Sequence, residues 1–336
     1  MPDTRHILPR EQLQLLQRKS LWRAGWMLVV NWALVAASFA LVAWRPDVPA
    51  LLAAMLVLGG RQLGLGILMH ECAHRSLLPS QTMNDWVGRW LCAAPMFADL
   101  EVYRAYHMKH HVKTGTDADP DLQNYAGYPV TPASMLRKVA RDVIGLTGLK
   151  ALATLAVLYS YQDPRQLKFG YAYRKSATQA AQASDGEAAP RRHPKYLLWN
   201  MRRMLLVHGA AAAALWWGGH GVLYLLWPAS WLSSYMLFAR IRNAAEHGAL
   251  PGTMSTDIWS NTRTVTARWW ERLTVAPNYV NFHFEHHLAP TVPSYNLPAL
   301  HRWLKDQGLL ERAQLAHGYP QVIRALVAGS ARARSA

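Results

Sequence analysis

The sequence predicts an all-α, polytopic membrane protein with four transmembrane helices, arranged as two hairpins and capped by a cytoplasmic helical domain that holds a di-metal site. Two observations lead to this prediction. Hydrophobic residues make up 51% of the 336 residues and charged residues only 17%, and the hydrophobic residues gather in runs long enough to cross a hydrocarbon core of about 30 Å. Histidines gather in short clusters near the ends of these runs. We therefore treat residues 1–336 as a single membrane domain.

The formal net charge of the chain is +16, which on a soluble protein would suggest nucleic-acid binding. Many of the arginines flank the apolar runs, where they can contact anionic headgroups and orient the chain. No nucleic-acid partner is therefore expected. The two cysteines, Cys72 and Cys92, are too few for a disulfide framework and are expected to be reduced. The polar N-terminal stretch lacks the features of a cleaved signal peptide.

The first 69 residues predict a basic surface helix and a transmembrane hairpin. Residues 1–23 combine arginines with leucines, a pattern typical of an amphipathic helix that lies on a membrane. Residues 24–69 hold two apolar runs, which are separated by a turn signal at residues 45–47. A hairpin returns to the side that it left, so the basic N-terminus and the first histidines share one compartment. The positive-inside rule makes that compartment the cytoplasm.

Residues 70–203 are expected to be cytoplasmic. They carry the first two histidine clusters and, at residues 83–99, a tryptophan-rich stretch that is too short to span and is expected at the membrane interface. The run 143–161 is apolar enough to cross. A dense series of lysines and arginines follows it in residues 162–203, so we predict that it does not cross. Residues 176–190 have the composition of a flexible loop.

Residues 204–240 predict the second transmembrane hairpin. Its turn is expected at residues 218–221, which contain three glycines, between a short first arm and a longer second arm. The second arm ends just before Asn243 and delivers His247 to the cytoplasm. Residues 241–336 carry the last histidine cluster, and no further span is expected there.

Nine of the 15 histidines fall into clusters with helical spacing. Rings at positions i, i+3 and i+4 share one face of a helix. Crowded imidazoles repel one another when protonated and lack hydrogen bonds when buried unpaired, so the pattern favours lone pairs that converge on metal. Nine rings exceed the needs of one ion, although imidazole suits iron, copper, nickel and zinc alike. The candidate ligands are His70, His74, His107, His110, His111, His247, His283, His286 and His287. The six isolated histidines are interpreted as ordinary core residues.

Two other functions fit part of this pattern. Residues 70–74 match H-E-x-x-H, the zinc metalloprotease signature in which Glu is the general base. A protease needs only one further ligand, so the other clusters would be left unexplained. A metal transporter is the non-enzymatic alternative, but transport sites lie near the bilayer midplane, whereas these clusters lie at or beyond the ends of the predicted spans.

The order of the clusters resembles the integral-membrane fatty acid desaturase family. H-x-x-x-H at residues 70–74 and H-x-x-H-H at residues 107–111 are followed by N-x-x-x-H at residues 243–247. The last cluster is His283-Phe284-Glu285-His286-His287, and with its flanks it looks like the third box of that family. The resemblance covers roughly residues 48–305.

This resemblance implies a non-haem di-iron centre that uses O2 as co-substrate and abstracts hydrogen from a fatty acyl chain. The nine histidines would be the iron ligands, and Asn243 would bind one iron through a water. The acyl substrate could be a lipid, an acyl-CoA or an acyl carrier protein. Desaturation is favoured, but a hydroxylase, acetylenase or ketolase can share such a centre.

The resemblance also implies a separate electron donor. The third box begins with His283, whereas front-end desaturases with a fused cytochrome b5 often have Gln there, and the sequence has no His-Pro-Gly-Gly haem motif. Electrons are therefore expected from a ferredoxin, a rubredoxin or a cytochrome b5-like protein with its reductase. The expected location is a bacterial inner membrane, with membrane lipids as neighbours and the active site facing the cytoplasm.

Several other residues are compatible with two roles each, one functional and one purely structural. Carboxylates near the clusters could orient the ligand histidines or could be solvated, and four tryptophans could line an acyl tunnel or could be ordinary interface residues. Arg61, inside the second apolar run, could mark function or could snorkel or pair with another helix. The residues concerned are Glu71, Glu246, Glu285, Asp117, Asp119, Asp121, Trp86, Trp90, Trp269 and Trp270.

Overall fold

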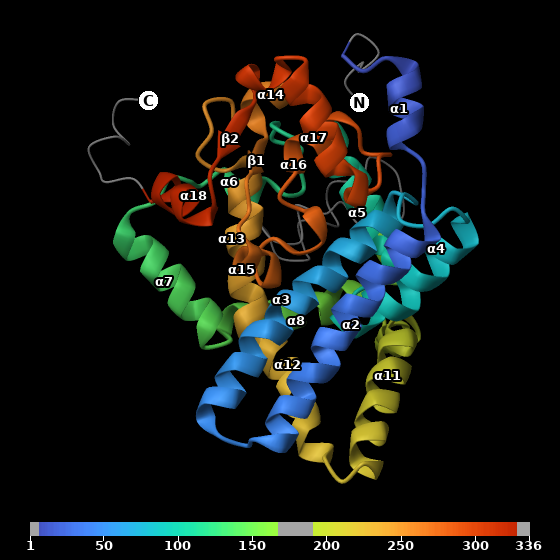
Figure 1. The fold of residues 1–336 in the computed structure, drawn as a ribbon. Coiled ribbons are helices and arrows are strands. Elements are labelled where there is room, and N and C mark those ends of the chain that lie inside the picture. The colour runs from blue at the N-terminus through green and yellow to red at the C-terminus, as the bar shows by residue number, and fades with distance from the viewer. Residues whose placement is uncertain (1–6, 167–190, 328–336) are drawn as a thin grey trace.

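The computed structural model describes residues 7–166 and 191–327, and its fold is helical, as predicted (Figure 1). The helices of the first half are α1 Arg10–Leu16, α2 Leu21–Trp44, α3 Val48–Ala73, α4 Gln81–Val87, α5 Leu100–Lys113, α6 Leu122–Tyr125, α7 Pro132–Val143 and α8 Leu146–Tyr159. The second half contains α11 Pro194–Trp217, α12 Leu226–Ser230, α13 Met236–His247, α14 Ile258–Asn261, β1 Arg263–Val265, α15 Trp269–Leu273, α16 His283–Leu288, α17 Leu297–Asp306, β2 Gln314–Ala316 and α18 Tyr319–Leu326. The predicted loop at residues 176–190 lies outside the described residues.

Three helical stretches are long and apolar enough to cross a membrane: α2, α3 and Gly221–His247, which contains α12 and α13. Asp47 begins α3 by accepting a hydrogen bond from the Ala50 amide at 2.9 Å, so the turn between α2 and α3 lies where the sequence predicts it. The chain is therefore a membrane protein.

Helix α11 leads into the third stretch through residues 218–221, which is the predicted turn of the second hairpin. The first half of α11 carries charged residues, and its apolar arm begins only near Met204. Figure 1 shows α2, α3, α11 and α12 together at the end of the molecule that is far from both termini. This arrangement agrees with two hairpins, and four spans remain our prediction.

Helices α7 and α8 meet at a bend of 65° and would make a fourth candidate span only if they were counted as one broken helix. The bend is placed by Gly145, whose φ of +85° favours glycine. Gly148 then packs so closely on Leu232 that a Cβ would lie 2.6 Å from the Leu232 Cα. The helices have 12 and 14 residues, and each is shorter than the roughly 20 residues of a span. We retain the prediction that residues 143–161 do not cross.

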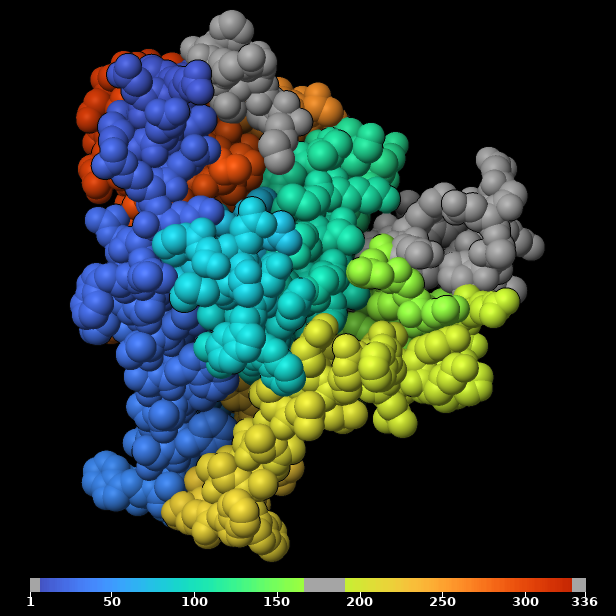
Figure 2. Space-filling view, turned by 90° about the vertical axis from the view of Figure 1, so that its right-hand side faces the viewer, coloured from blue at the N-terminus to red at the C-terminus, as the bar shows by residue number. Residues whose placement is uncertain are grey.

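The N-terminal segment differs from the predicted surface helix over residues 1–23. Helix α1 is short, and Ser20 starts a separate helix, α2, by accepting from the Arg23 amide at 3.3 Å. Leu8 and Leu16 are buried with apolar residues of α16 and α17, so α1 packs on the C-terminal region, as the blue and red segments show in Figure 2. The leucine pattern identifies an apolar face, but it cannot distinguish a lipid surface from a protein surface.

The C-terminal segments α14, α16 and α17 lie beyond the upper end of α3 (Figure 1). Strands β1 and β2 pair in parallel, with Arg263 opposite Gln314, and form a small sheet that the all-α prediction omitted. Strands of three residues are too short to show an alternating pattern. Arg61 of α3 donates to the backbone carbonyls of Arg272 and Leu273 at 2.8 and 3.0 Å. This buried arginine therefore pairs with another helix, which was one of its two expected roles.

Candidate metal centre

Four helices bring the nine candidate histidines together where their ends converge. Helix α3 contributes the first cluster at its C-terminus, α5 contributes three rings from two turns, α13 ends on His247, and α16 contributes the last three. Asp99 fixes the start of α5 by accepting from the amides of Glu101 and Val102 at 3.0 and 3.1 Å. Asn281 ties the segment before α16 to β1 through a 2.8 Å hydrogen bond to the Val265 carbonyl.

The rings form two groups in which the ligand atoms all lie within 4.8 Å of one another. The five-histidine group consists of His70, His74, His107, His111 and His286. The four-histidine group consists of His110, His247, His283 and His287. The structure thus brings together all nine histidines that the sequence singled out, and it divides them into two sites.

The ring nitrogens face one another at short distances. The Nε2 atom of His107 lies 2.9 Å from the Nε2 atoms of both His74 and His111, and His283 and His247 approach in the same way at 3.0 Å. The Nε2 atoms of His70 and His287 are buried and have no hydrogen-bond partner among the described residues. Such buried, convergent lone pairs fit a metal ion in each group.

Burial also keeps most of these rings neutral. Loss of hydration, followed by repulsion from neighbouring rings, holds the pKa well below its ordinary value of 6.5 in five histidines of α5 and α16. These are His107, His111, His283, His286 and His287. A neutral imidazole keeps the lone pair that a metal needs, so the donor set is compatible with two resident ions.

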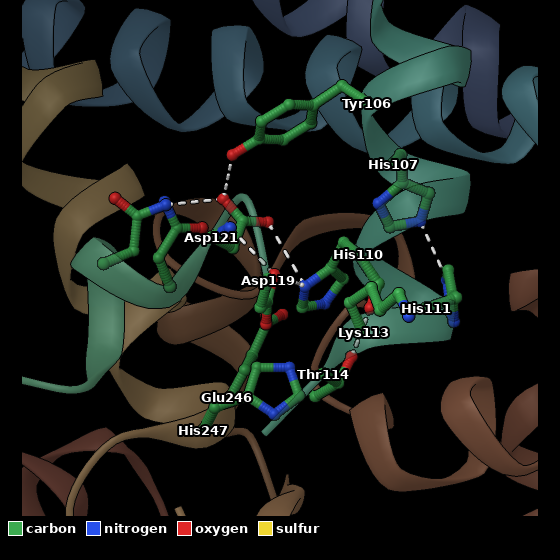
Figure 3. Close-up of polar contacts among 12 residues, drawn as sticks. Tyr106, His107, His110, His111, Lys113, Thr114, Asp119, Asp121, Glu246 and His247 are labelled. Atoms are coloured by element: carbon green, nitrogen blue, oxygen red, sulfur yellow. Dashed lines mark hydrogen bonds and ion pairs between the residues drawn. The ribbon is translucent and has the colours of Figure 1, made fainter. Parts of the chain in front are cut away.

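His110 has the opposite shift because two carboxylates face it. Its Nδ1 lies 2.9 Å from Asp119 Oδ1 and 3.7 Å from Asp121 Oδ2 (Figure 3). Burial alone would lower the pKa of His110, but these acids outweigh it and the pKa is raised. Burial likewise disfavours the charged form of Asp119, but its hydrogen bond to His110 lowers the pKa of that carboxyl. With Nδ1 held in this way, Nε2 is the atom directed to the four-histidine group.

Three more rings have an outer partner at Nδ1. His247 lies 2.9 Å from the backbone oxygen of Asn261, and His283 lies 3.2 Å from Glu246. Within the five-histidine group, the Nδ1 of His70 lies 3.1 Å from Glu71.

Glu71 also joins distant segments of the chain. Its second oxygen accepts from the Ser76 hydroxyl at 2.9 Å and from the Ser294 amide at 2.8 Å. The first histidine cluster is thereby connected to the segment that follows α16.

The remaining candidate carboxylates behave differently. Asp117 is exposed. Glu285 is fully buried, and its carboxylate accepts from Thr264 Oγ1 and pairs with His301 Nδ1. The pairing of His301 with Glu285 was not predicted, and the sequence analysis interpreted His301 as an ordinary core residue. The two residues are far apart along the chain, so no helical spacing connects them.

Asn243 lies one turn before His247 on α13 and is half-buried. Its side-chain oxygen accepts from Arg242 Nη1 at 2.8 Å. Its predicted role as a partner of a metal-bound water remains a prediction.

Two cavities meet beside α5. One of about 720 Å³ is lined mainly by charged residues, including Arg89, Arg202 and Arg203. The other, of about 530 Å³, lies between α5 and α8 and reaches Tyr103, whose ring stacks on His107 at 5.4 Å. Both are lined by Val102. Within the described residues, the four tryptophans proposed as tunnel walls line neither cavity, and Trp86, Trp269 and Trp270 are exposed.

Comparison with known proteins identifies a family that the chain matches. The family model described as fatty acid desaturase matches residues 46–319. The chain is 26% identical over 73% of its length to the dihydrorhizobitoxine desaturase of Bradyrhizobium elkanii, 22% identical over 91% to a chloroplastic omega-6 fatty acid desaturase of Brassica napus, and 23% identical over 72% to a Synechocystis sn-1 oleoyl-lipid 12-desaturase. The matches span 64%, 64% and 65% of these relatives' own lengths.

Proposed function

Because this chain belongs to the fatty acid desaturase family, we propose that it is an O2-dependent membrane desaturase that inserts a double bond into an acyl chain. The observation that supports the proposal best is the convergence of nine buried or half-buried histidines into two adjacent groups. Each group would hold one iron, and Asn243 would add a water-mediated contact to one of them.

Two irons, held by the two histidine groups, would supply from O2 an oxidant strong enough to remove hydrogen from an unactivated C–H bond. The residues of this chain have three tasks around that chemistry. Burial keeps the ligand rings neutral, Asp119, Glu246 and Glu71 orient individual rings, and the covering C-terminal segments exclude water. Where ionised, these carboxylates would also offset part of the positive charge that neutral ligands leave on two cations.

The electron donor is proposed to be a separate ferredoxin, rubredoxin or cytochrome b5-like protein with its reductase. The site is proposed to face the cytoplasm from a bacterial inner membrane, because the basic N-terminus and the arginine-rich segments lie on the same side as the histidines under the positive-inside rule.

The contacts of Glu71 argue against a zinc protease. The general base of H-E-x-x-H must be able to reach a water at the metal. Here both carboxylate oxygens are engaged, one by His70 and the other by Ser76 and Ser294. The nine-ligand arrangement also exceeds the three protein ligands of such a site.

A second candidate function has the same chemistry but a different substrate. The relative from Bradyrhizobium elkanii is named for dihydrorhizobitoxine, not for a fatty acid, so desaturation of a smaller molecule is a specific alternative. A hydroxylase, acetylenase or ketolase outcome is distinguished by the same analysis of products.

The test is expression of the wild type beside His286→Ala in one host, followed by mass spectrometry of lipids and polar metabolites with double-bond localisation. We expect a new double bond in acyl chains with the wild type only. We also expect about two irons per purified chain, because nine imidazoles exceed the needs of one metal. Identical products from both strains, or an active preparation that holds zinc and is indifferent to iron removal, would refute the proposal.

A further inference from the structure

We propose that Arg242 is a positioning residue of the metal centre, which acts through two neighbours on α13, Glu246 and Asn243. It holds the carboxyl of Glu246 against the ligand His283, and it turns the amide of Asn243 so that the nitrogen, a hydrogen-bond donor, is the free end. This inference rests on the proposed function, because it assumes a metal ion in each histidine group.

Arg242 places a positive charge beside sites that are each expected to hold a cation. Its side chain is only 15% exposed. Burial and two neighbouring rings lower the pKa of His283, and the charge of Arg242 adds to this effect. A charge that is largely removed from water is costly unless it is paired and hydrogen-bonded. The partners of this guanidinium therefore indicate what it is for.

The first partner is a carboxyl group that faces a ligand. Nε of Arg242 lies 2.6 Å from Oε1 of Glu246, one turn later on α13. The same oxygen lies 3.2 Å from Nδ1 of His283. One oxygen atom thus joins the guanidinium to a ring of the four-histidine group, and its position is fixed in either protonation state of Glu246. With Nδ1 of His283 engaged in this way, Nε2 is the atom left for a metal.

The second partner is the side-chain amide of Asn243. Nη1 of Arg242 donates to Oδ1 of Asn243 at 2.8 Å. A guanidinium has only donors, so it can face the oxygen end of an amide but not the nitrogen end. Within the residues that the structure describes, Nδ2 of Asn243 has no hydrogen-bond partner. A water that Asn243 contacts at one of the metal sites would therefore accept a hydrogen bond from this nitrogen.

The backbone at the end of α13 is held by other residues. Arg263 donates to the backbone carbonyl of Ala245 at 2.9 Å. The hydroxyl of Thr253 donates to the backbone carbonyl of His247 at 3.1 Å. The contacts of Arg242 described above are, in contrast, with side chains. Loss of Arg242 should therefore displace two side chains and leave the helix in place.

Arg240 supplies a matched control on the same helix. It also pairs with a buried carboxylate, that of Asp142, so its loss also leaves an acid without its partner. Asp142 lies on α7 and accepts its other side-chain hydrogen bond from Thr147, not from a ligand histidine. Arg240→Gln and Arg242→Gln should both lower the Tm of the metal-free protein, but only the second should change a metal site.

The main experiment is a chelator titration of the purified protein, with iron counted per chain. Arg242→Gln should weaken the binding of one iron about 10–100-fold, the range for outer partners of a metal ligand, and should retain the other iron. Glu246→Ala should lose at least as much, and the double variant should lose no more than Glu246→Ala alone, because both changes break one chain of contacts. Arg240→Gln should titrate like the wild type.

A lysine at the same position separates the two contacts. Arg242→Lys can keep an i, i+4 ion pair with Glu246, but a single ammonium lacks the fork that reaches two partners. Iron affinity should therefore return close to the wild-type value, whereas turnover per iron-loaded molecule should stay low. The visible spectrum of the Co²⁺-substituted protein reports coordination without turnover. It should change in Arg242→Gln and not in Arg240→Gln.

The donor role is tested at Asn243 itself. Asn243→Asp keeps the size of the side chain and can still accept from Arg242, but a carboxylate has no hydrogen to donate. Turnover per iron-loaded molecule should fall about tenfold or more, with the iron content retained. Wild-type turnover in Asn243→Asp would show that the oxygen end of the amide is the one that the site uses, and would overturn this part of the inference.

Two further results would overturn the inference. Wild-type iron affinity in Arg242→Gln would remove this residue from the metal centre. An equal loss of affinity in Arg240→Gln would reduce the effect to the loss of a buried ion pair. Failure of the proposed function is recognised separately, because His286→Ala would then give the same products as the wild type. A failure of this inference alone leaves that difference in products intact.

Discussion

The two histidine groups share helices α5 and α16 but are held in different ways. Within the described residues, three of the four rings in the four-histidine group have an outer partner at Nδ1, two of them carboxylates: His110, His247 and His283. Among the residues that the structure describes, His70 is the one ring of the five-histidine group with such a partner; the other rings pack edge to face on one another, and His107 also stacks on Tyr103. The four-histidine group is thus oriented mainly by polar partners outside it, whereas the five-histidine group is oriented mainly by ring packing.

If each group holds a metal ion, as proposed, this difference predicts that the two sites respond differently to mutation. Outer partners tune both the orientation and the basicity of a ligand, so the four-histidine site should be sensitive to residues beyond its ligands. The five-histidine site should be sensitive chiefly to the loss of a ring. The following predictions test that contrast, beginning with the largest expected effect.

The strongest test removes neighbouring rings of α16 one at a time. His286→Ala takes a ligand from the five-histidine group and His287→Ala takes one from the four-histidine group. Each should lower activity by at least about 100-fold, beyond the 10–100-fold typical of outer partners, and should release about one iron when iron is measured per chain. His193→Ala, an exposed cap of α11, is the control. Full activity in either ligand variant would show that its group is not required.

Removal of one outer carboxylate tests more closely whether the two histidine groups are oriented in different ways. Asp119→Ala removes the nearer of the two carboxylates that face Nδ1 of His110, so the four-histidine site should bind iron about 10–100-fold more weakly. A chelator titration with iron counted per chain measures this loss, and the second iron should be retained. Asp117→Ala, an exposed change two residues away, should titrate like the wild type. Parallel loss of both irons, or equal loss in the control, would contradict selective orientation of one site.

Asn243 tests whether one of the two sites also uses a water-mediated contact. Asn243→Ala should keep the fold and most of the iron, because direct ligands remain, yet lower activity by about tenfold or more. His247→Ala should lose both iron and activity. Turnover per iron-loaded molecule is compared with thermal stability. A lower Tm with unchanged turnover would mean that Asn243 only supports the end of α13.

The smallest effect concerns acid stability without metal. The five rings with lowered pKa values bind fewer protons when folded than when unfolded, so their contribution to stability falls as the pH drops through about 6.5. His110 acts in the opposite sense, because its raised pKa adds stability at low pH that is lost as the pH rises through its folded value. Metal-free protein should therefore melt at a lower Tm at about pH 5.5 than at about pH 7.5. Asp119→Ala should steepen this dependence, and a Tm that rises on acidification would contradict it.

The sequence predicted the long-range features that carry a periodic signal. The α2–α3 hairpin, the turn near residue 220 and the convergence of nine histidines all follow from apolar length, glycine placement and i, i+4 spacing. The thiols Cys72 and Cys92 are also free, as expected.

Features that depend on contacts between distant segments could not be predicted in this way. The Asn261 carbonyl that holds His247, the pairing of His301 with Glu285, and the burial of α1 against α17 join residues with no common period. The tryptophans illustrate the reverse case. In the sequence, aromatic residues near apolar runs are equally compatible with a lipid interface and a tunnel wall. The exposure of Trp86, Trp269 and Trp270 in the structure favours the lipid interface.

The division of α5 and α16 between both metal groups has a consequence for biosynthesis. His107 and His111 serve one group while His110 serves the other, and His286 and His287 are divided in the same manner. Neither group is complete until ribosomes have translated α16, as far as residue 286 for the five-histidine group and residue 287 for the four-histidine group, which is after both predicted hairpins. Each complete site can therefore form only after α16 has been made, in a chain whose predicted membrane hairpins have already been translated. A nascent chain arrested before α16 would keep four of the five histidines of one group but only His110 and His247 of the other, so the two groups should lose metal affinity unequally.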